Sequence, residues 1–178
     1  MMSHFKTALA DVLKHEGGYV DHQNDNGGAT AFGISLRFLS ALPALAGDVN
    51  GDGHVNKDDV KALSKEDAAK FYEKSFWLHY RLNEIEAESV AVKLMNLFVN
   101  MRGKTAALIA QRAANDLGAG LVEDGILGSK SIAVLNRLEA EQVLVCIKYQ
   151  AWAVYKAIVE NTPSQAVFIN GWKKRAFA

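Results

Sequence analysis

Glu16 is the residue of this chain whose position best suits acid catalysis. Phe5, Leu9, Val12 and Glu16 follow one another at steps of four, three and four residues along a helix predicted over residues 3–17, so they share one face. Desolvation and the negative end of the helix dipole both raise the pKa of a carboxyl in that place. A general acid needs a carboxyl that keeps its proton near neutral pH. Helix position alone, however, favours a simpler interpretation, an exposed Glu at the end of an amphipathic helix.

The residues after Glu16 indicate chemistry on a glycosidic bond. Residues 17–33 are punctuated by glycine and contain Asp25 and Thr30, which predicts a small turn-rich β-lobe. Cleavage of a glycosidic bond uses one protonated carboxyl together with an ionised carboxylate or a positioned water. An acid at a helix end and an Asp on a glycine-rich turn can face each other across a groove, and glycines let sugar rings approach the backbone. A role for Asp25 as a turn former is an equally good interpretation.

The sequence E-G-G-Y at residues 16–19, followed by D-x-G-G, a Thr and G-I, resembles glycoside hydrolase family 108, the bacterial and prophage N-acetylmuramidases. The order Glu, Asp, Thr is also similar to that of phage-type lysozymes. The resemblance implies a lysozyme-like fold, mainly α with a small β-lobe. It implies hydrolysis of the β-1,4 bond between N-acetylmuramic acid and N-acetylglucosamine, with Glu16 as general acid and with Asp25 and Thr30 positioning or activating the water. Tyr19 of the same motif is a candidate for substrate binding.

The resemblance extends over most of the chain. Residues 97–100 look like the family's helix motif ending in V-N, although residues 101–103 depart from it, and Asn100 is a second candidate for substrate binding. A polar residue at a helix end is the equally good alternative for Asn100. Residues 124–128 resemble the D-G-x-x-G turn of small peptidoglycan-binding modules, where we expect a structural turn. Residues 170–175 match the family's closing G-W-x-x-R motif. The predicted organisation is a lysozyme-like catalytic part over 1–102 and a helical, peptidoglycan-binding-like part over 103–178, packed as one body.

Residues 48–59 match the twelve-residue calcium-loop template. Oxygen-bearing side chains occupy loop positions 1, 3, 5, 9 and 12, with Gly at position 6 and an apolar residue at position 8. We expect this insertion to hold a structural calcium ion, and we expect catalysis to need no cofactor. The predicted ligands are the side chains of Asp48, Asn50, Asp52 and Asp59, the carbonyl of His54, and Asn56 directly or through water. The alternative is a solvated polar turn without metal.

Composition limits the partners. The chain has 178 residues, with 20 basic and 20 acidic side chains, and this zero net charge argues against a general nucleic-acid binder. Residues 145–178 carry five basic residues against one acidic residue, which suits an anionic wall, although solvated helix faces explain it equally well. No apolar run approaches the roughly 20 residues of a membrane span, and the single Cys146 excludes an internal disulfide framework.

The expected partner is therefore peptidoglycan, and the expected state is a monomer without membrane insertion. Residues 1–6 lack the apolar core of a signal peptide, so we expect synthesis in the cytoplasm and action on the wall after release or export, as for an endolysin. Two other functions stay open. A lytic transglycosylase would need only Glu16 and would leave an anhydro sugar. A non-catalytic wall-binding or secretion-accessory protein would keep the fold without using the carboxyl.

Overall fold

The computed structural model describes residues 2–14, 19–20, 29–43 and 45–178. Helices dominate these residues, and the strands are limited to one two-stranded antiparallel sheet. The predicted fold class, mainly α and lysozyme-like with a small β-lobe, is confirmed. None of the described helices is long and apolar enough to span a membrane.

Contacts between residues divide the chain into two units, of which the first combines residues 1–8 with 76–178 and the second covers residues 9–75. Helix α1 (Met2–Leu13) contributes residues to both units. This division by contact differs from the division at residue 102 that the motifs predict. The packing of the motif-based parts as one body stays a prediction.

The second unit is built around the small sheet. Strands β1 (Thr30–Ala31) and β2 (Ile34–Ser35) form a hairpin, and three short helices follow it. These helices are α2 (Leu36–Ser40), α3 (Lys57–Ala62) and α4 (Lys65–Tyr72). Each begins at a side chain that accepts a backbone N–H bond, as expected of an N-cap. Those N-caps are Ser35, Asn56 and Ser64. The buried core of this unit includes Ile34, Leu39, Val60, Ala68 and Tyr72.

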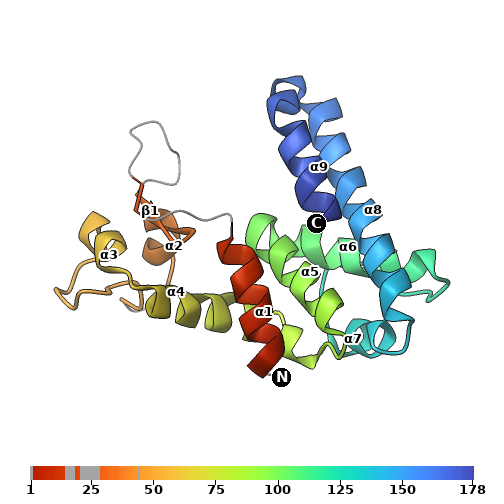
Figure 1. Cartoon of the computed structure of the whole chain (residues 1–178), viewed down its shortest axis with the longest axis horizontal. Helices are drawn as coiled ribbons and strands as arrows, with labels where there is room; N and C mark the ends of the chain where they lie inside the picture. Colours follow the sequence, from red (N-terminus) through yellow and green to blue (C-terminus); the bar gives the residue numbers. More distant parts are fainter. Residues whose placement is uncertain (1, 15–18, 21–28, 44) are drawn as a thin grey trace. The chain divides into compact units, whose positions relative to one another are not determined.

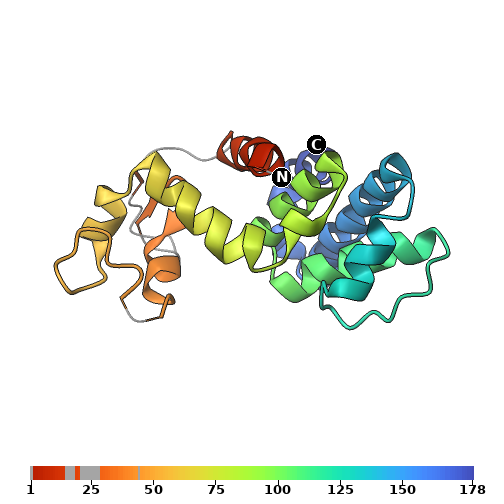
Figure 2. The same ribbon diagram turned by 90° about the horizontal axis from the view of Figure 1, so that it is seen from below.

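The first unit is a helical assembly (Figure 1). Its larger helices are α5 (Glu88–Asn100), α6 (Gly103–Asp116), α7 (Ser129–Leu135), α8 (Ala140–Asn161) and α9 (Ile169–Phe177). Helix α8 packs against α5, α6 and α9, and both views show it beside α9 as a long hairpin (Figures 1 and 2). Three short helical turns complete the chain. They are η1 (Glu73–Leu78), η2 (Leu82–Glu84) and η3 (Pro163–Phe168).

The ends of the helices differ from those that the sequence predicts. The capping-box pattern of residues 64–67 predicts a helix through about Trp77, and Ser64 is the N-cap of α4 as expected, but α4 ends at Tyr72 and the chain continues as a π-helical turn through η1. The first helix ends at Leu13, before the predicted stop at Gly17, which lies outside the described residues. Helix ends are set by local caps and packing rather than by the apolar pattern, which explains why they are the least predictable feature.

Candidate active site and peptidoglycan-binding region

Thr30, the described member of the predicted catalytic set, lies in β1 and is half-buried. Two backbone hydrogen bonds join it to Val20, from Val20 N to Thr30 O and from Thr30 N to Val20 O, both 2.8 Å long. Val20 follows Tyr19 directly, so this bridge pairs Thr30 with the residue next to Tyr19. Tyr19 is 40% exposed, as a side chain that stacks on a sugar must be.

The hairpin that carries Thr30 is closed by a turn of defined type. Phe32 and Gly33 form its two-residue loop, and both have positive φ angles, 51° and 75°, as a type I′ turn requires. A left-handed backbone conformation is energetically unfavourable for phenylalanine but not for glycine. The buried Tyr72 compensates, because its hydroxyl donates a 3.1 Å hydrogen bond to the carbonyl of Phe32. Helix α4 thereby fixes the turn of the β-lobe.

Glu16 and Asp25, the two predicted catalytic carboxylates, lie outside the described residues. The helix before Glu16 does show the predicted apolar face, since Val12 is buried and Ala8 is fully buried. Phe5, on the same stripe, lies against Trp77 with ring centroids 5.7 Å apart.

Asn100, the second predicted substrate-binding residue, is exposed at the last position of α5. Its side-chain amide donates a 2.8 Å hydrogen bond to the carbonyl of Asn96, one turn earlier. Among the described residues, none donates a hydrogen bond to the side-chain carbonyl oxygen of Asn100. Asn100 belongs to the first contact unit, whereas Tyr19 and Thr30 belong to the second.

The predicted calcium loop lies between α2 and α3, and its carboxylates accept backbone N–H groups. Asp48 accepts from Gly51 at 2.8 Å and from Asp52 at 3.1 Å through Oδ1, and from Gly53 at 2.8 Å through Oδ2. Gly51 and Gly53 have φ angles of 78° and 87°, a backbone that glycine adopts without strain. The first half of the loop is therefore wound around the Asp48 carboxylate.

Asp59 organises the second half of the loop from a fully buried position. Its Oδ1 accepts from Val49 N at 2.7 Å and from Asn50 N at 3.2 Å, and its Oδ2 accepts from Asn56 N at 2.7 Å. Burial alone would raise the pKa of this carboxyl. The N–H groups of Asn56, Asn50 and Val49 together outweigh burial and hold the pKa below its ordinary value.

Calcium needs six to eight oxygen ligands. Among the residues that the structure describes, no group of three or more His, Cys, Asp or Glu side chains is arranged to hold a metal ion. Of the predicted ligands, Asn50 donates to Asp52 Oδ2 at 3.1 Å, and His54 N donates to Asp52 Oδ1 at 2.8 Å. A carboxylate oxygen that accepts one N–H bond keeps a lone pair for an ion. Calcium binding by this loop stays a prediction.

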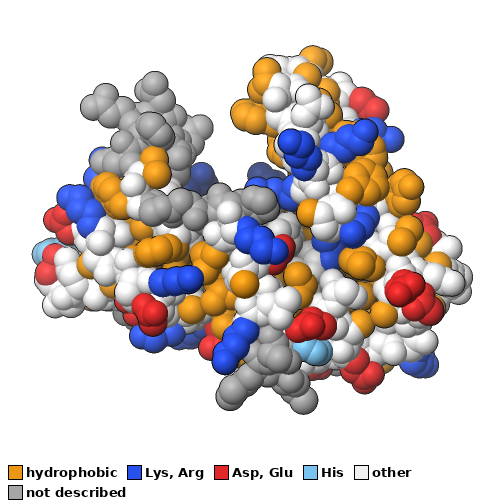
Figure 3. Space-filling view, viewed as in Figure 1, with side chains coloured by type: hydrophobic (Ala, Val, Ile, Leu, Met, Phe, Trp, Pro, Cys, Tyr) orange, Lys and Arg blue, Asp and Glu red, His pale blue; other side chains and the backbone are white. Residues whose placement is uncertain are grey.

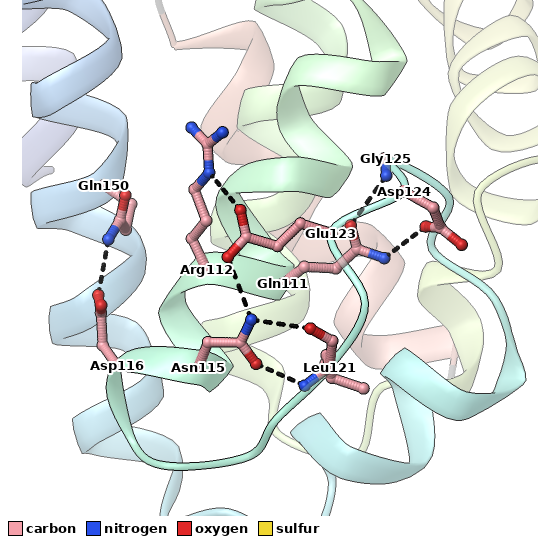
Figure 4. A network of polar contacts seen from close by, with 9 residues as sticks. All are labelled: Gln111, Arg112, Asn115, Asp116, Leu121, Glu123, Asp124, Gly125 and Gln150. Atoms are coloured by element: carbon pink, nitrogen blue, oxygen red, sulfur yellow. Dashed lines mark hydrogen bonds and ion pairs between the residues drawn. The ribbon is translucent and has the colours of Figure 1, made fainter.

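The D-G-x-x-G segment forms the predicted structural turn before α7, and a buried glutamine anchors it (Figure 4). Gln111 of α6 donates from Nε2 to Asp124 Oδ1 at 2.7 Å and accepts at Oε1 from Gly125 N at 2.9 Å. Gly125 has a φ angle of 75°, and a Cβ atom there would meet the Lys104 side chain at 2.5 Å. The motif is therefore explained by a turn docked on α6.

The sequence analysis missed Gln111 and the capping role of Asp59, although the sequence carries a signal for each. Asp59 stands three residues after the N-cap Asn56, which is the spacing of a capping box. Gln111 is a polar residue on the otherwise apolar, alanine-rich face of α6. A buried polar side chain at such a position must find partners, and here the partners come from a distant loop.

Comparison with known proteins assigns two successive segments of the chain. A family model described as Glycosyl hydrolase 108 matches residues 9–101, more than half of the chain, and one described as Predicted Peptidoglycan domain matches residues 105–177. Among solved structures, that of Brucella abortus SagA is similar, with a TM-score of 0.73 and 25% sequence identity over 99% of this chain and 91% of that one. None of the curated proteins matches the chain significantly. The chain therefore belongs to the Glycosyl hydrolase 108 family and is a glycosidase that acts on peptidoglycan.

Proposed function

We propose that the protein is an N-acetylmuramidase, which hydrolyses the β-1,4 bond between N-acetylmuramic acid and N-acetylglucosamine with Glu16 as its general acid. The observation that carries the proposal is the match of the family model to residues 9–101, because this one segment contains Glu16, Asp25 and Thr30. The motif order of these residues is that of the family.

Each proposed residue has one chemical task. Glu16 donates its proton to the bridging oxygen as the bond from this oxygen to the anomeric carbon breaks, so that the leaving sugar departs as an alcohol. Asp25 accepts a proton from a water whose oxygen attacks the anomeric carbon from the opposite face, and Thr30 positions this water. One water molecule is added across the bond, and the configuration at the anomeric carbon is inverted.

The positions of Thr30 and Val12 support this proposal. The bridge from Val20 to Thr30 pairs the threonine with the residue that follows Tyr19. Val12, four residues before Glu16 in the sequence, is buried in α1. We expect Glu16 to share apolar surroundings, which would raise the pKa of its carboxyl as an acid catalyst requires.

The test is Glu16→Gln, measured as loss of turbidity of purified cell walls. Glutamine has almost the same shape but no proton to donate, so we expect activity to fall by about 100-fold or more, with an unchanged melting temperature. Glu66→Gln, at an exposed position of α4, is the matched control and should keep full activity. Activity of Glu16→Gln within about twofold of the wild type would remove Glu16 from the mechanism.

Mass spectrometry of the digested wall distinguishes the alternatives. A muramidase leaves a reducing N-acetylmuramic acid end, whereas a lytic transglycosylase leaves an anhydro sugar at the same position. The proposal requires the reducing end. An anhydro product would replace hydrolysis by transglycosylation, and binding to the wall without any cleaved product would leave a non-catalytic accessory protein.

A further inference from the structure

We propose that one face of α9, formed by Asn170, Lys173, Lys174 and Phe177 and extended by Tyr149 of α8, binds peptidoglycan through both its sugar rings and its acidic stem peptides. The inference deepens the proposed function by assigning substrate-binding residues outside the segment that carries Glu16. It rests on that function in one respect only, namely that peptidoglycan is the substrate.

The four α9 residues share one face of the helix. They stand at positions i, i+3, i+4 and i+7, which bring side chains to the same side. Together they line a hollow of about 590 Å³, a size in the range of small-ligand sites. The hollow combines an amide, two ammonium groups and an aromatic ring within two turns of helix.

An aromatic cluster stands exposed at one end of this face. Phe177 is 36% exposed and Tyr149 is 63% exposed, and their rings meet edge to face with centroids 5.4 Å apart. The ring of Trp152 also lies near Phe177, at a centroid distance of 6.3 Å. Lys148 donates a 3.0 Å hydrogen bond from Nζ to the carbonyl of Phe177, which ties the end of α9 to α8. Rigid exposed aromatic rings of this kind suit stacking on the apolar faces of sugars.

The charge of residues 145–178 is unbalanced although the charge of the whole chain is not. Residues 145–178 carry Lys148, Lys156, Lys173, Lys174 and Arg175 against Glu160 alone, whereas the whole chain has a net charge of zero. None of these five cations takes part in an ion pair among the described residues. Figure 3 shows Lys and Arg side chains interspersed with hydrophobic ones over α8 and α9. Lys173 and Lys174 therefore offer positive charge that the described residues do not neutralise.

Peptidoglycan is the partner that matches the aromatic rings, the lysines and the amide of this face. Its glycan presents sugar faces and acetamido groups, which suit Phe177, Tyr149 and the amide of Asn170. Its muramic acid residues carry peptides with carboxylates, which suit Lys173 and Lys174. The whole face lies in α8 and α9, within the segment 105–177 matched by the model described as Predicted Peptidoglycan domain. An anionic membrane surface would use the same lysines, and the experiment separates the two.

The experiment measures sedimentation of the full-length protein with purified peptidoglycan sacculi, in the Glu16→Gln background so that the wall is not consumed. We expect Lys173→Gln with Lys174→Gln to weaken binding about three- to tenfold at low salt, since two exposed ion pairs are lost. The matched control, Lys104→Gln with Lys130→Gln, removes two exposed lysines elsewhere and should bind as before. Tyr149→Ala should weaken binding about threefold or more at any salt concentration.

Removal of the stem peptides by an amidase adds a second readout. On the bare glycan the lysine variant should bind as well as its parent, whereas Tyr149→Ala should still bind less well. The proposal would be overturned if both double lysine variants lost sacculus binding equally. It would also be overturned if Lys173→Gln with Lys174→Gln bound sacculi as well as its parent does. Lysine-dependent binding to phosphatidylglycerol vesicles together with lysine-independent binding to sacculi would overturn it too. Lysis that survives Glu16→Gln would instead overturn the proposed function and leave this binding site standing.

Discussion

At the scale of single residues, Asp59 explains most about the insertion between α2 and α3. It is fully buried and accepts hydrogen bonds from three backbone N–H groups of the loop that it closes. Hydrogen bonds to a charged acceptor contribute more than neutral ones, about 1.5–3 kcal/mol each. Asp59 is therefore expected to stabilise the second unit whether or not an ion is bound.

Asp59→Asn should destabilise the protein most at neutral pH. The folded pKa of Asp59 lies below its ordinary value of 3.8, so the unfolded chain binds more protons between the two pKa values. The stability that the carboxylate contributes is complete above the ordinary pKa and is lost as the pH falls through the folded pKa. In urea denaturation, the free energy of unfolding of the variant should be about 2–4 kcal/mol lower than that of the wild type at pH 7. This difference should become smaller below about pH 4.

Asp58→Asn is the control for this comparison. Asp58 stands beside Asp59, but it is exposed and pairs with Lys61 at 2.8 Å on the surface. Such a pair contributes at most about 1 kcal/mol, so this variant should differ little from the wild type. A gap for Asp59→Asn that stays constant from pH 7 to pH 3 would contradict a charged role for Asp59.

Asp25→Asn should lower turnover strongly but less completely than Glu16→Gln. Under the proposed mechanism Asp25 activates the water, and an oxocarbenium-like centre is still captured slowly by unactivated water. The check is the rate of reducing-end formation from purified peptidoglycan. Turnover at the wild-type level would point to a transglycosylase, for which an anhydro product is the confirming result.

The sequence offers candidate active-site residues by type and order, which stay predictions, but it could not predict hydrogen-bond partners far along the chain. The bond from Tyr72 to Phe32, 40 residues apart, supports the type I′ turn, and only Gly33 hinted at that turn. Likewise, the calcium-loop pattern identified Asp48 and Asp59 as important oxygens. It did not distinguish an acceptor of backbone N–H groups from a metal ligand, because both tasks favour the same side chains.

At the scale of elements, Gln111 shows how α6 holds the segment before α7. Its amide makes hydrogen bonds with Asp124 and Gly125, while Asn115 on the same helix bonds both backbone groups of Leu121 (Figure 4). The amide of Gln111 also donates to the carbonyl of Ile126 and to the hydroxyl of Ser131. A loop without helix or strand of its own depends on such bonds for a fixed shape. The network lies in the segment matched as a peptidoglycan domain and suits a structural role.

Gln111→Leu should destabilise the protein by about 1–3 kcal/mol, because it leaves the N–H of Gly125 and the hydroxyl of the buried Ser131 without this partner. Calorimetry measures the loss, and amide exchange should accelerate for residues 121–128. Gln150→Ala is the control, since its 2.7 Å bond to Asp116 lies on the surface. An unchanged melting temperature for Gln111→Leu would show that the turn holds its shape without α6.

Calcium should raise the melting temperature, and chelator should lower it, if the 48–59 loop binds the ion as predicted. Only the folded loop gathers these oxygens, so the ion stabilises the folded state by linkage. Asp48→Ala with Asp52→Ala should abolish the difference, and magnesium should substitute poorly because it prefers a tighter octahedral site. Calorimetric titration without calcium heat at millimolar concentration would leave the hydrogen-bonded loop as the whole explanation.

Element types followed from apolar spacing, whereas element ends depended on individual caps. The turn at residues 124–125 and the pattern after it predict a helix over 129–138, and α7 begins at Ser129 as expected but ends at Leu135. The predicted β-lobe is present as a hairpin of two-residue strands, which backbone pairing defines more than side-chain pattern does. Local propensity therefore sets the class of each element, and tertiary contacts set its length.

At the scale of the whole molecule, the contact units and the family segments divide the chain differently. The family segments meet between residues 101 and 105, whereas the contact boundaries fall after residues 8 and 75. Each contact boundary lies inside a continuous helical segment, α1 at the first and the π-helical turn η1 at the second. A helix interrupted at its middle loses hydrogen bonds on both sides of the break, so partial unfolding at these boundaries is costly.

We therefore expect the chain to unfold in one cooperative transition, as the predicted packing of the two parts into one body requires. Scanning calorimetry should give a calorimetric enthalpy equal to the van't Hoff enthalpy. Asp59→Asn perturbs residues 9–75 and Gln111→Leu perturbs residues 76–178, so each variant marks a different contact unit. In a cooperative body both variants lower the same single melting temperature. The contrary result is two transitions, with Asp59→Asn lowering the temperature of one and Gln111→Leu that of the other. Such a result would show that the two units unfold independently, although helices cross the boundaries between them.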